Sequence, residues 1–168
     1  MDYEVGDKVM HPAHGAGQIT AVKDIELVEG FEHYYEIEIP SESLTLNIPM
    51  RKMDDVGIRP VMKETRLERV LEILAGVPEE LSDNYKARQA GIRNKIRTGH
   101  PLKLAEAVRD MTWRQEIDSL TRGDTKLLDQ ARELLAEEIA LVNDTSVIEA
   151  TKLIDTTLQK GFQNAESA

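Results

Sequence analysis

The spacing of apolar residues changes near residue 62, and this change divides the chain of 168 residues into two parts. Before that point, apolar residues alternate with polar ones between turn-forming residues, for example over 35–39 and 44–48. Such alternation is typical of antiparallel strands with one buried face. A stretch of about 60 residues with four or five such strands fits a small barrel. We therefore predict an SH3-like or Tudor-like antiparallel β-barrel over residues 1–62.

After residue 62, apolar residues recur at intervals of three and four, which indicates amphipathic helices. Signals that start helices recur as well. They stand at Thr65 with Glu68, Ser82, Pro101, Thr121 with Asp124, and Ser146 with Glu149. We predict a compact all-helical domain of about five helices over 63–168, in which 162–168 form a frayed tail. The fold class is thus α+β, with a β domain followed by a helical domain.

The composition limits the chemistry that the chain can perform. It contains no cysteine, which excludes disulfides, thiolate chemistry and Cys-bound metal centres. His11 and His14 lie three apart in a loop with no third ligand nearby, so loop hydrogen bonding is favoured over metal binding. No run of about 18 apolar residues could cross a membrane, and the start of the chain is acidic rather than apolar. These features indicate a cytoplasmic protein.

No catalytic motif is evident either. The glycines at 15 and 17 precede a predicted strand rather than a helix, which favours a tight turn over a phosphate-binding loop. The sequence shows no nucleophile elbow, Walker motif or paired acids in a catalytic context. We expect no enzymatic activity and no cofactor.

Charge is distributed unevenly along the chain. The net charge of −10 disfavours a protein that coats nucleic acid with its whole surface. Between positions 86 and 109, however, seven Lys or Arg residues face only Glu106. The stretch is either a solvated helix surface or a local surface that attracts phosphate. In the second case we expect DNA contacts from Lys86, Arg88, Arg93, Lys95 and Arg97.

Two large apolar residues flank this basic stretch. Leu81 could insert at a base step beside the cations, or it could pack onto the following helix as a hydrophobic staple. Trp113 is the only tryptophan, and packing against a neighbouring element is favoured over an exposed stacking role.

The first loop carries a specific pattern. Residues 3–17 resemble the opening of CarD-family bacterial transcription regulators, also called CdnL. Further family-like segments occur at 44–49, 56–59, 85–87, 107–110 and 128–135, so the resemblance covers nearly the whole chain. A domain similar to the first one also occurs in the transcription-repair coupling factor, where a helicase motor accompanies it.

The resemblance implies a non-catalytic regulator of transcription initiation. The β domain would bind the β subunit of RNA polymerase, and the helical domain would contact promoter DNA at the upstream edge of the bubble and stabilise the open complex. The implied polymerase contacts are Ile25, Leu27, Thr45 and Asn47. We expect a monomer that binds free DNA weakly and depends on tethering by polymerase.

The sequence departs from the family pattern at contact positions. Leu81 stands where many members carry tryptophan, Asp83 and Asn84 stand where they carry arginines, and Lys86 is retained. Ile25 and Asn47 also replace family arginines. The alternative function is therefore a polymerase-binding adaptor that has lost direct DNA contact.

Overall fold

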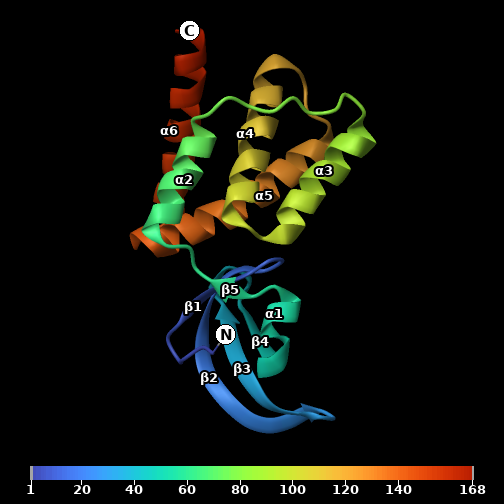
Figure 1. Ribbon diagram of the computed structural model, residues 1–168, viewed down its shortest axis with the longest axis vertical. Helices are drawn as coiled ribbons and strands as arrows, with labels where there is room; N and C mark the ends of the chain where they lie inside the picture. Colours follow the sequence, from blue (N-terminus) through green and yellow to red (C-terminus); the bar gives the residue numbers. More distant parts are fainter. Residues whose placement is uncertain (1, 168) are drawn as a thin grey trace. The chain divides into compact units, whose positions relative to one another are not determined.

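The computed structural model describes residues 2–167, and the chain forms two compact units. The first unit ends at Val61 and the second begins at Met62. Strands make up most of the first unit, and helices make up the second (Figure 1). We call them the β unit and the helical unit.

The β unit contains five strands and three short helical turns. The strands are β1 (Lys8–His11), β2 (Gly15–Val28), β3 (Phe31–Ile39), β4 (Leu44–Pro49) and β5 (Arg59–Pro60). The turns are η1 (Pro40–Glu42), η2 (Met50–Lys52) and α1 (Met53–Val56). The strand order is β4-β3-β2-β1-β5, and every neighbouring pair is antiparallel.

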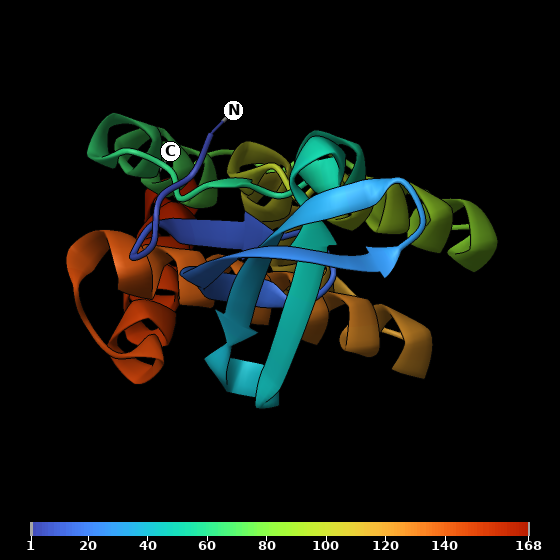
Figure 2. The same cartoon turned by 90° about the horizontal axis from the view of Figure 1, so that it is seen from below.

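The β unit is an open five-stranded antiparallel sheet, which agrees with the small SH3-like or Tudor-like β domain that the sequence predicts. Within residues 2–167 no pairing joins β4 to β5, so these two strands are its edges. The register of β2 against β3 shifts between Ile19 and Ala21 and again between Asp24 and Val28. Such irregularities increase the local twist and bend of a strand pair. Figure 2 shows the resulting curvature of β2 and β3.

The concave face of this sheet forms a small core of its own. Ile19, Ile37 and Ile39 are at most 1% exposed, as the alternation in the sequence predicts. Gly17 lies directly against them, and a Cβ atom there would stand 2.7 Å from Ile39 Cδ1. The backbone of β2 can approach this core closely because position 17 has no side chain.

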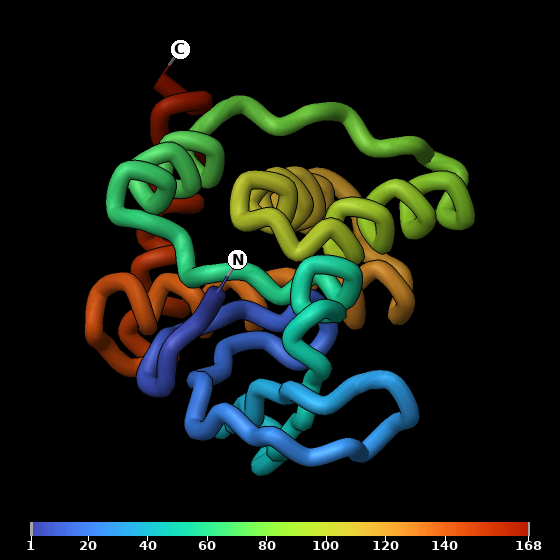
Figure 3. The backbone as a smooth tube through the Cα atoms, turned by 60° about the horizontal axis from the view of Figure 1, so that its bottom comes forward, coloured from blue at the N-terminus to red at the C-terminus, as the bar shows by residue number. Residues whose placement is uncertain are grey.

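The helical unit contains the five helices that the sequence predicts. They are α2 (Glu64–Leu74), α3 (Tyr85–Thr98), α4 (Pro101–Ile117), α5 (Arg122–Asn143) and α6 (Val147–Glu166). α4 packs on α2, α3 and α5, while α6 packs on α5 and α2. At the contact between α2 and α6, a Cβ atom on Gly161 would lie 3.1 Å from the carbonyl oxygen of Ala75. Figure 3 shows 75–84 as an extended segment between α2 and α3.

Three of the five predicted helix starts are confirmed. The hydroxyl of Thr121 accepts a hydrogen bond from the backbone N–H of Asp124, and the carboxylate of Asp124 accepts one from the backbone N–H of Thr121, which is a complete capping box. Ser146 caps α6 by accepting from the backbone N–H of Glu149. Pro101 occupies the first turn of α4, as predicted.

The other two starts lie elsewhere. α2 begins after Lys63, so Thr65 is already inside the first turn, where its side chain cannot act as the cap. α3 is capped by Asn84, whose Oδ1 accepts from the backbone of Ala87 at 3.0 Å. Ser82 stands two residues too early and instead accepts from the backbone N–H of Asn84. Asn and Ser are nearly equivalent caps, so the sequence did not distinguish them.

The frayed tail that we expected over 162–168 is not observed over 162–166, because α6 continues to Glu166, and residue 168 lies outside the described residues. Phe162 packs against the helical core, and its ring lies 4.6 Å from the ring of Trp113 on α4. The aromatic contact gives the last turns of α6 an apolar partner. Trp113 thus packs against a neighbouring helix, as the sequence analysis favoured.

Candidate functional site

The basic stretch forms helix α3, which presents two differently charged sides. At about 100° per residue, Lys86, Arg93 and Arg97 fall within about 40° of one another around the helix. All three side chains are exposed. Arg88 and Lys95 lie on the side that carries the buried residues of α3. We call the exposed set of Lys86, Arg93 and Arg97 the cationic stripe.

Arg88 is buried and does not belong to the DNA-facing set that we predicted. It is 4% exposed, and its Nη2 lies 2.7 Å from Oδ2 of Asp124, which is fully buried. Its Nε also donates to Asp124 Oδ1 at 3.2 Å, which makes the ion pair bidentate. Its Nη1 donates to the carbonyl oxygen of Ser82 at 2.9 Å. Arg88 therefore fastens α3 to the start of α5.

The electrostatics of Asp124 reflect this pairing. Burial alone would raise the pKa of Asp124, but hydrogen bonds from Arg88, the backbone of Thr121 and Gln89 outweigh it and lower the pKa to about 2. The hydrogen bond to Asp124 in turn raises the pKa of Arg88, against the opposing effect of burial. The pair is charged at neutral pH and holds α3 and α5 together.

Lys95 is directed toward α4 rather than toward solvent. Its Nζ lies 3.1 Å from Glu106 Oε2 and 3.8 Å from Asp110 Oδ2. Lys103 reaches the same oxygen of Glu106 at 3.3 Å. Burial would raise the pKa of Glu106, but the hydrogen bonds from Lys95 and Lys103 prevail and lower it. Of the predicted DNA contacts, Lys95 is thus partly neutralised within the protein.

The cationic stripe remains available for an anionic partner. Within residues 2–167 its three side chains form no ion pair, and Arg93 makes one hydrogen bond, to Gln89 Oε1 at 3.3 Å. The stripe covers about 16 Å of helix, since each residue advances by about 1.5 Å. α3 itself contains no acidic residue. Asp83, just before the helix, is paired with Arg114 at 3.4 Å.

Leu81 is partly buried and packs against the helical core. This contact favours the packing interpretation of Leu81 over insertion at a base step. It also places Leu81 in the wall of a pocket, which is described below.

In the β unit, the four predicted polymerase contacts are all exposed. Thr45 and Asn47 lie on the edge strand β4, opposite Glu38 and Glu36 of β3. Ile25 is 44% exposed and Leu27 is 54% exposed, both on the distal half of β2. Residues 25 and 27 therefore lie on one arm of the β2–β3 hairpin, while residues 45 and 47 lie on the sheet edge.

Two apolar residues on this arm were missed by the sequence analysis. Val22 is 46% exposed and Val28 is 57% exposed, so β2 presents apolar side chains to solvent along its distal half. For Val28 the signal was present in the sequence, because 25–28 contains three apolar residues in a chain segment that is otherwise strongly acidic.

The histidines of the first loop serve local hydrogen bonding. His11 Nδ1 accepts from the backbone N–H groups of Ala13 and His14, and His14 Nδ1 lies 2.6 Å from Glu42 Oε2. Burial lowers the pKa of His11. Over residues 2–167 the structure groups no three metal-binding side chains together, and none of its helices has the length and apolarity that a membrane crossing requires.

The two units correspond to two known domains. Residues 3–62 match the family model of the CarD-like/TRCF RID domain, in which RID denotes the RNA-polymerase-interacting domain. Residues 69–155 match the model of the CarD C-terminal domain, and this match covers about half of the chain. The chain belongs to the CarD family. Members of the CarD family are non-catalytic transcription factors, and the protein is therefore a transcription factor rather than an enzyme.

A curated relative of this CarD-family protein covers most of both chains. It is YdeB of Bacillus subtilis (strain 168), named "Putative transcription factor YdeB", and it is 31% identical over 140 residues. The match includes 83% of this chain and 92% of YdeB. The similarity thus spans the β unit and the helical unit together.

Proposed function

We propose that this CarD-family protein binds the β subunit of RNA polymerase through its β unit and stabilises the open promoter complex through α3. The observation that carries the proposal is the cationic stripe of Lys86, Arg93 and Arg97 on a chain with a net charge of −10. In the proposed complex, α3 contacts the DNA backbone at the upstream edge of the bubble.

The open sheet of the β unit supports the polymerase contact. Edge strand β4 pairs with β3 on one side only, and Thr45 and Asn47 are exposed along it. An edge strand can accept a strand of another protein by backbone hydrogen bonding. The exposed apolar residues Ile25 and Leu27 supply a second contact surface on the hairpin arm.

Tethering to polymerase explains how only three cations could stabilise the promoter complex. Three phosphate contacts give a salt dependence with a log–log slope of only about −2.7 on duplex DNA, which corresponds to weak binding of free DNA. Binding to polymerase holds the stripe near the promoter and raises its effective concentration. We therefore expect a monomer that stabilises the promoter complex only when bound to polymerase.

The DNA contact is tested by open-complex lifetime. Replacing the stripe with Lys86→Gln, Arg93→Gln and Arg97→Gln should shorten the lifetime and lower the magnitude of its log–log salt slope by about 0.9 per lost contact. A matched control is Lys126→Gln, Lys152→Gln and Lys160→Gln, which removes three exposed lysines from α5 and α6. An equal effect of both triple variants would refute the proposed role of the stripe.

The polymerase contact is tested separately. Ile25→Asp with Leu27→Asp should weaken co-purification with polymerase, because it introduces charge into an apolar contact. Val5→Asp is the control, since Val5 is 62% exposed outside the hairpin arm. Retention of polymerase by the double variant at the level of the control would exclude the hairpin arm.

The second candidate function is an adaptor without DNA contact. Asp83 beside the basic helix and the packed position of Leu81 favour it. Crosslinking of residues 86–97 to promoter DNA in the polymerase complex would refute the adaptor.

A further inference from the structure

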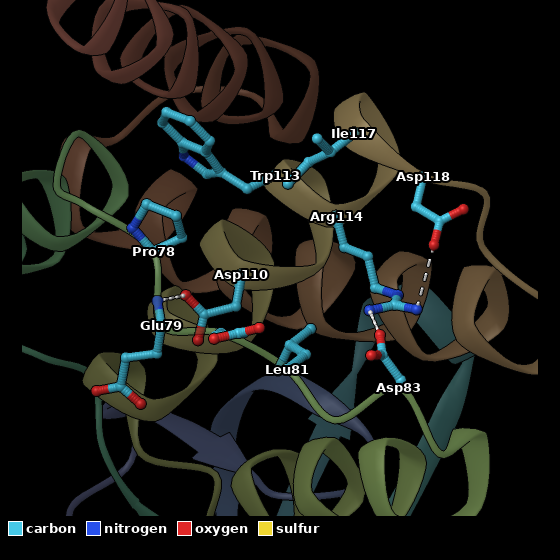
Figure 4. Close-up of a pocket in the computed structure, with 10 residues that line it drawn as sticks. Pro78, Glu79, Leu81, Asp83, Asp110, Trp113, Arg114, Ile117 and Asp118 are labelled. Carbon is cyan, nitrogen blue, oxygen red and sulfur yellow. Dashed lines mark hydrogen bonds and ion pairs between the residues drawn. The ribbon is translucent and has the colours of Figure 1, made fainter.

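A pocket lies between the extended segment 77–84 and helix α4, within the helical unit. Its volume is about 460 Å³, which falls in the range of small-ligand and peptide side-chain sites. Pro78, Leu81, Trp113 and Ile117 form its apolar wall (Figure 4). Trp113 is supported from behind by Phe162, whose ring lies 4.6 Å away. The pocket therefore has one firmly packed aromatic surface.

Unsatisfied polar atoms gather at this pocket. Within residues 2–167, the buried side-chain atoms without a hydrogen-bond partner are Asp110 Oδ2, Trp113 Nε1 and Arg114 Nε, and all three residues line the pocket. A buried donor or acceptor left unpaired is costly, so such atoms are rare in native proteins. Their concentration on one face of α4 leaves two donors and one acceptor at the pocket for a bound group to pair with.

The environment of Asp110 shows why one of its oxygens remains available. Its Oδ1 accepts from the backbone N–H of Glu79 at 3.0 Å and from Arg109 Nε at 2.8 Å. Oδ2 lies 3.8 Å from Lys95 Nζ, which is too far for a hydrogen bond. The side chain is fully buried, so it is a fixed acceptor rather than a mobile surface group.

Charge determines the class of ligand. The pocket is lined by five carboxylates, those of Glu79, Glu80, Asp83, Asp110 and Asp118. The only cation in its lining, Arg114, is paired with Asp83 at 3.4 Å and Asp118 at 3.6 Å. This surface repels phosphate and attracts cations. The pocket and the cationic stripe therefore attract ligands of opposite charge.

We propose that this pocket binds a basic side chain from a peptide segment of a partner protein. The aliphatic stem of the arginine or lysine lies against Trp113 and Leu81, and its charged head lies among Glu79 and Glu80. The two unpaired donors suit peptide carbonyl oxygens, and the unpaired acceptor suits a peptide N–H. Segment 77–84 has no helix or strand of its own. In the proposed complex, a small shift of this segment exposes the buried atoms to the peptide.

The rim of the pocket favours a peptide over a small polyamine. Ile117 lines the pocket and is 80% exposed. Apolar side chains that flank a basic residue in a peptide would cover such a rim. A polyamine would pair with the carboxylates but would leave the apolar side chain of Ile117 exposed to water.

The fluorescence of Trp113 tests the proposal, because this residue is the only tryptophan in the chain. The full-length protein is titrated with acetyl-Leu-Arg-Leu-amide, acetyl-Leu-Glu-Leu-amide and spermidine at low salt. We expect saturable binding of the arginine peptide with a Kd below about 1 mM, and at least tenfold weaker binding of the other two. Absence of saturation by the arginine peptide overturns the proposal, and equal binding of spermidine overturns the assignment to a peptide.

Paired variants locate the binding. Glu79→Gln with Glu80→Gln should raise the Kd of the arginine peptide by about threefold to tenfold, since exposed carboxylates contribute modestly. Glu68→Gln with Glu133→Gln removes the same charge from exposed positions on α2 and α5 and should leave the Kd unchanged. Equal effects of the two pairs would place the peptide outside the pocket. The titration contains neither polymerase nor DNA, so its result is independent of the proposed function.

Discussion

Replacement of Arg88 by methionine separates a structural role of this residue from a DNA-binding one. The substitution keeps an unbranched side chain but leaves the carboxylate of Asp124 buried without its main partner. Breaking a buried ion pair by removing one member costs about 3–5 kcal/mol. We therefore expect Arg88→Met to lower the free energy of unfolding by an amount in this range.

The pH dependence of stability gives a second, independent estimate of how much the ion pair between Arg88 and Asp124 stabilises the fold. The pKa of Asp124 is lowered from 3.8 to about 2, which corresponds to about 2 kcal/mol of stability at neutral pH. Because the folded-state pKa is the lower one, this contribution is present above about pH 4 and is lost as the pH falls through about 2. In Arg88→Met the buried carboxylate protonates at higher pH. The difference in stability between the two proteins should therefore narrow as the pH falls from 7 to 3.

Urea unfolding followed by Trp113 fluorescence measures both effects, since Trp113 lies in the helical unit. The matched control is Arg93→Met, an exposed position on the same helix, which should change stability by less than about 0.5 kcal/mol. If the two variants were equally stable and Arg88→Met shortened the open complex more than Arg93→Met did, the assignment of Arg88 to the interior would be refuted.

Three further substitutions test the packing. Phe162→Ala should destabilise the helical unit by about 1–3 kcal/mol and shift Trp113 emission, whereas unchanged emission would show that the last turns of α6 are dispensable. Gly17→Ala should cost about 1–3 kcal/mol in the β unit, measured by its thermal unfolding, because the new Cβ would lie 2.7 Å from Ile39 Cδ1. Gly91→Ala, with no atom within 4 Å of its Cβ, should instead raise stability by about 0.5–1 kcal/mol, and a loss there would contradict the open environment.

The sequence predicted where the helices and strands lie along the chain better than it predicted which of them contact one another. Hydrophobic spacing identified all five helices, and the capping box of Thr121 with Asp124 marked the start of α5. The antiparallel β domain was predicted as well, but the strand order was not, because strand alternation carries no information about which strands pair or whether β4 meets β5. The tail was wrong because the partner of Phe162 is Trp113, which lies 49 positions earlier in the chain.

The site was predictable in part. Arg88 precedes Ile92 and Ile96 by four and eight positions, so it continues the buried side of α3, and helical geometry alone could have identified it as an inward-facing residue. The partner of Arg88, in contrast, could not be identified from the sequence. Asp124 is also the third residue of a capping box, and no local pattern indicates that a cap carboxylate receives a distant arginine. The pocket residues could not be predicted, because which of their polar atoms lack a hydrogen-bond partner depends on how the folded chain packs.

The close approach of Gly161 to Ala75 has a consequence for biosynthesis. It joins the first helix of the helical unit to the last one, across 86 positions of sequence. During translation, α2 leaves the ribosome long before α6 exists, and the apolar face that α6 later covers stays open to solvent or chaperones meanwhile. The helical unit therefore completes its folding only after α6 has been synthesised.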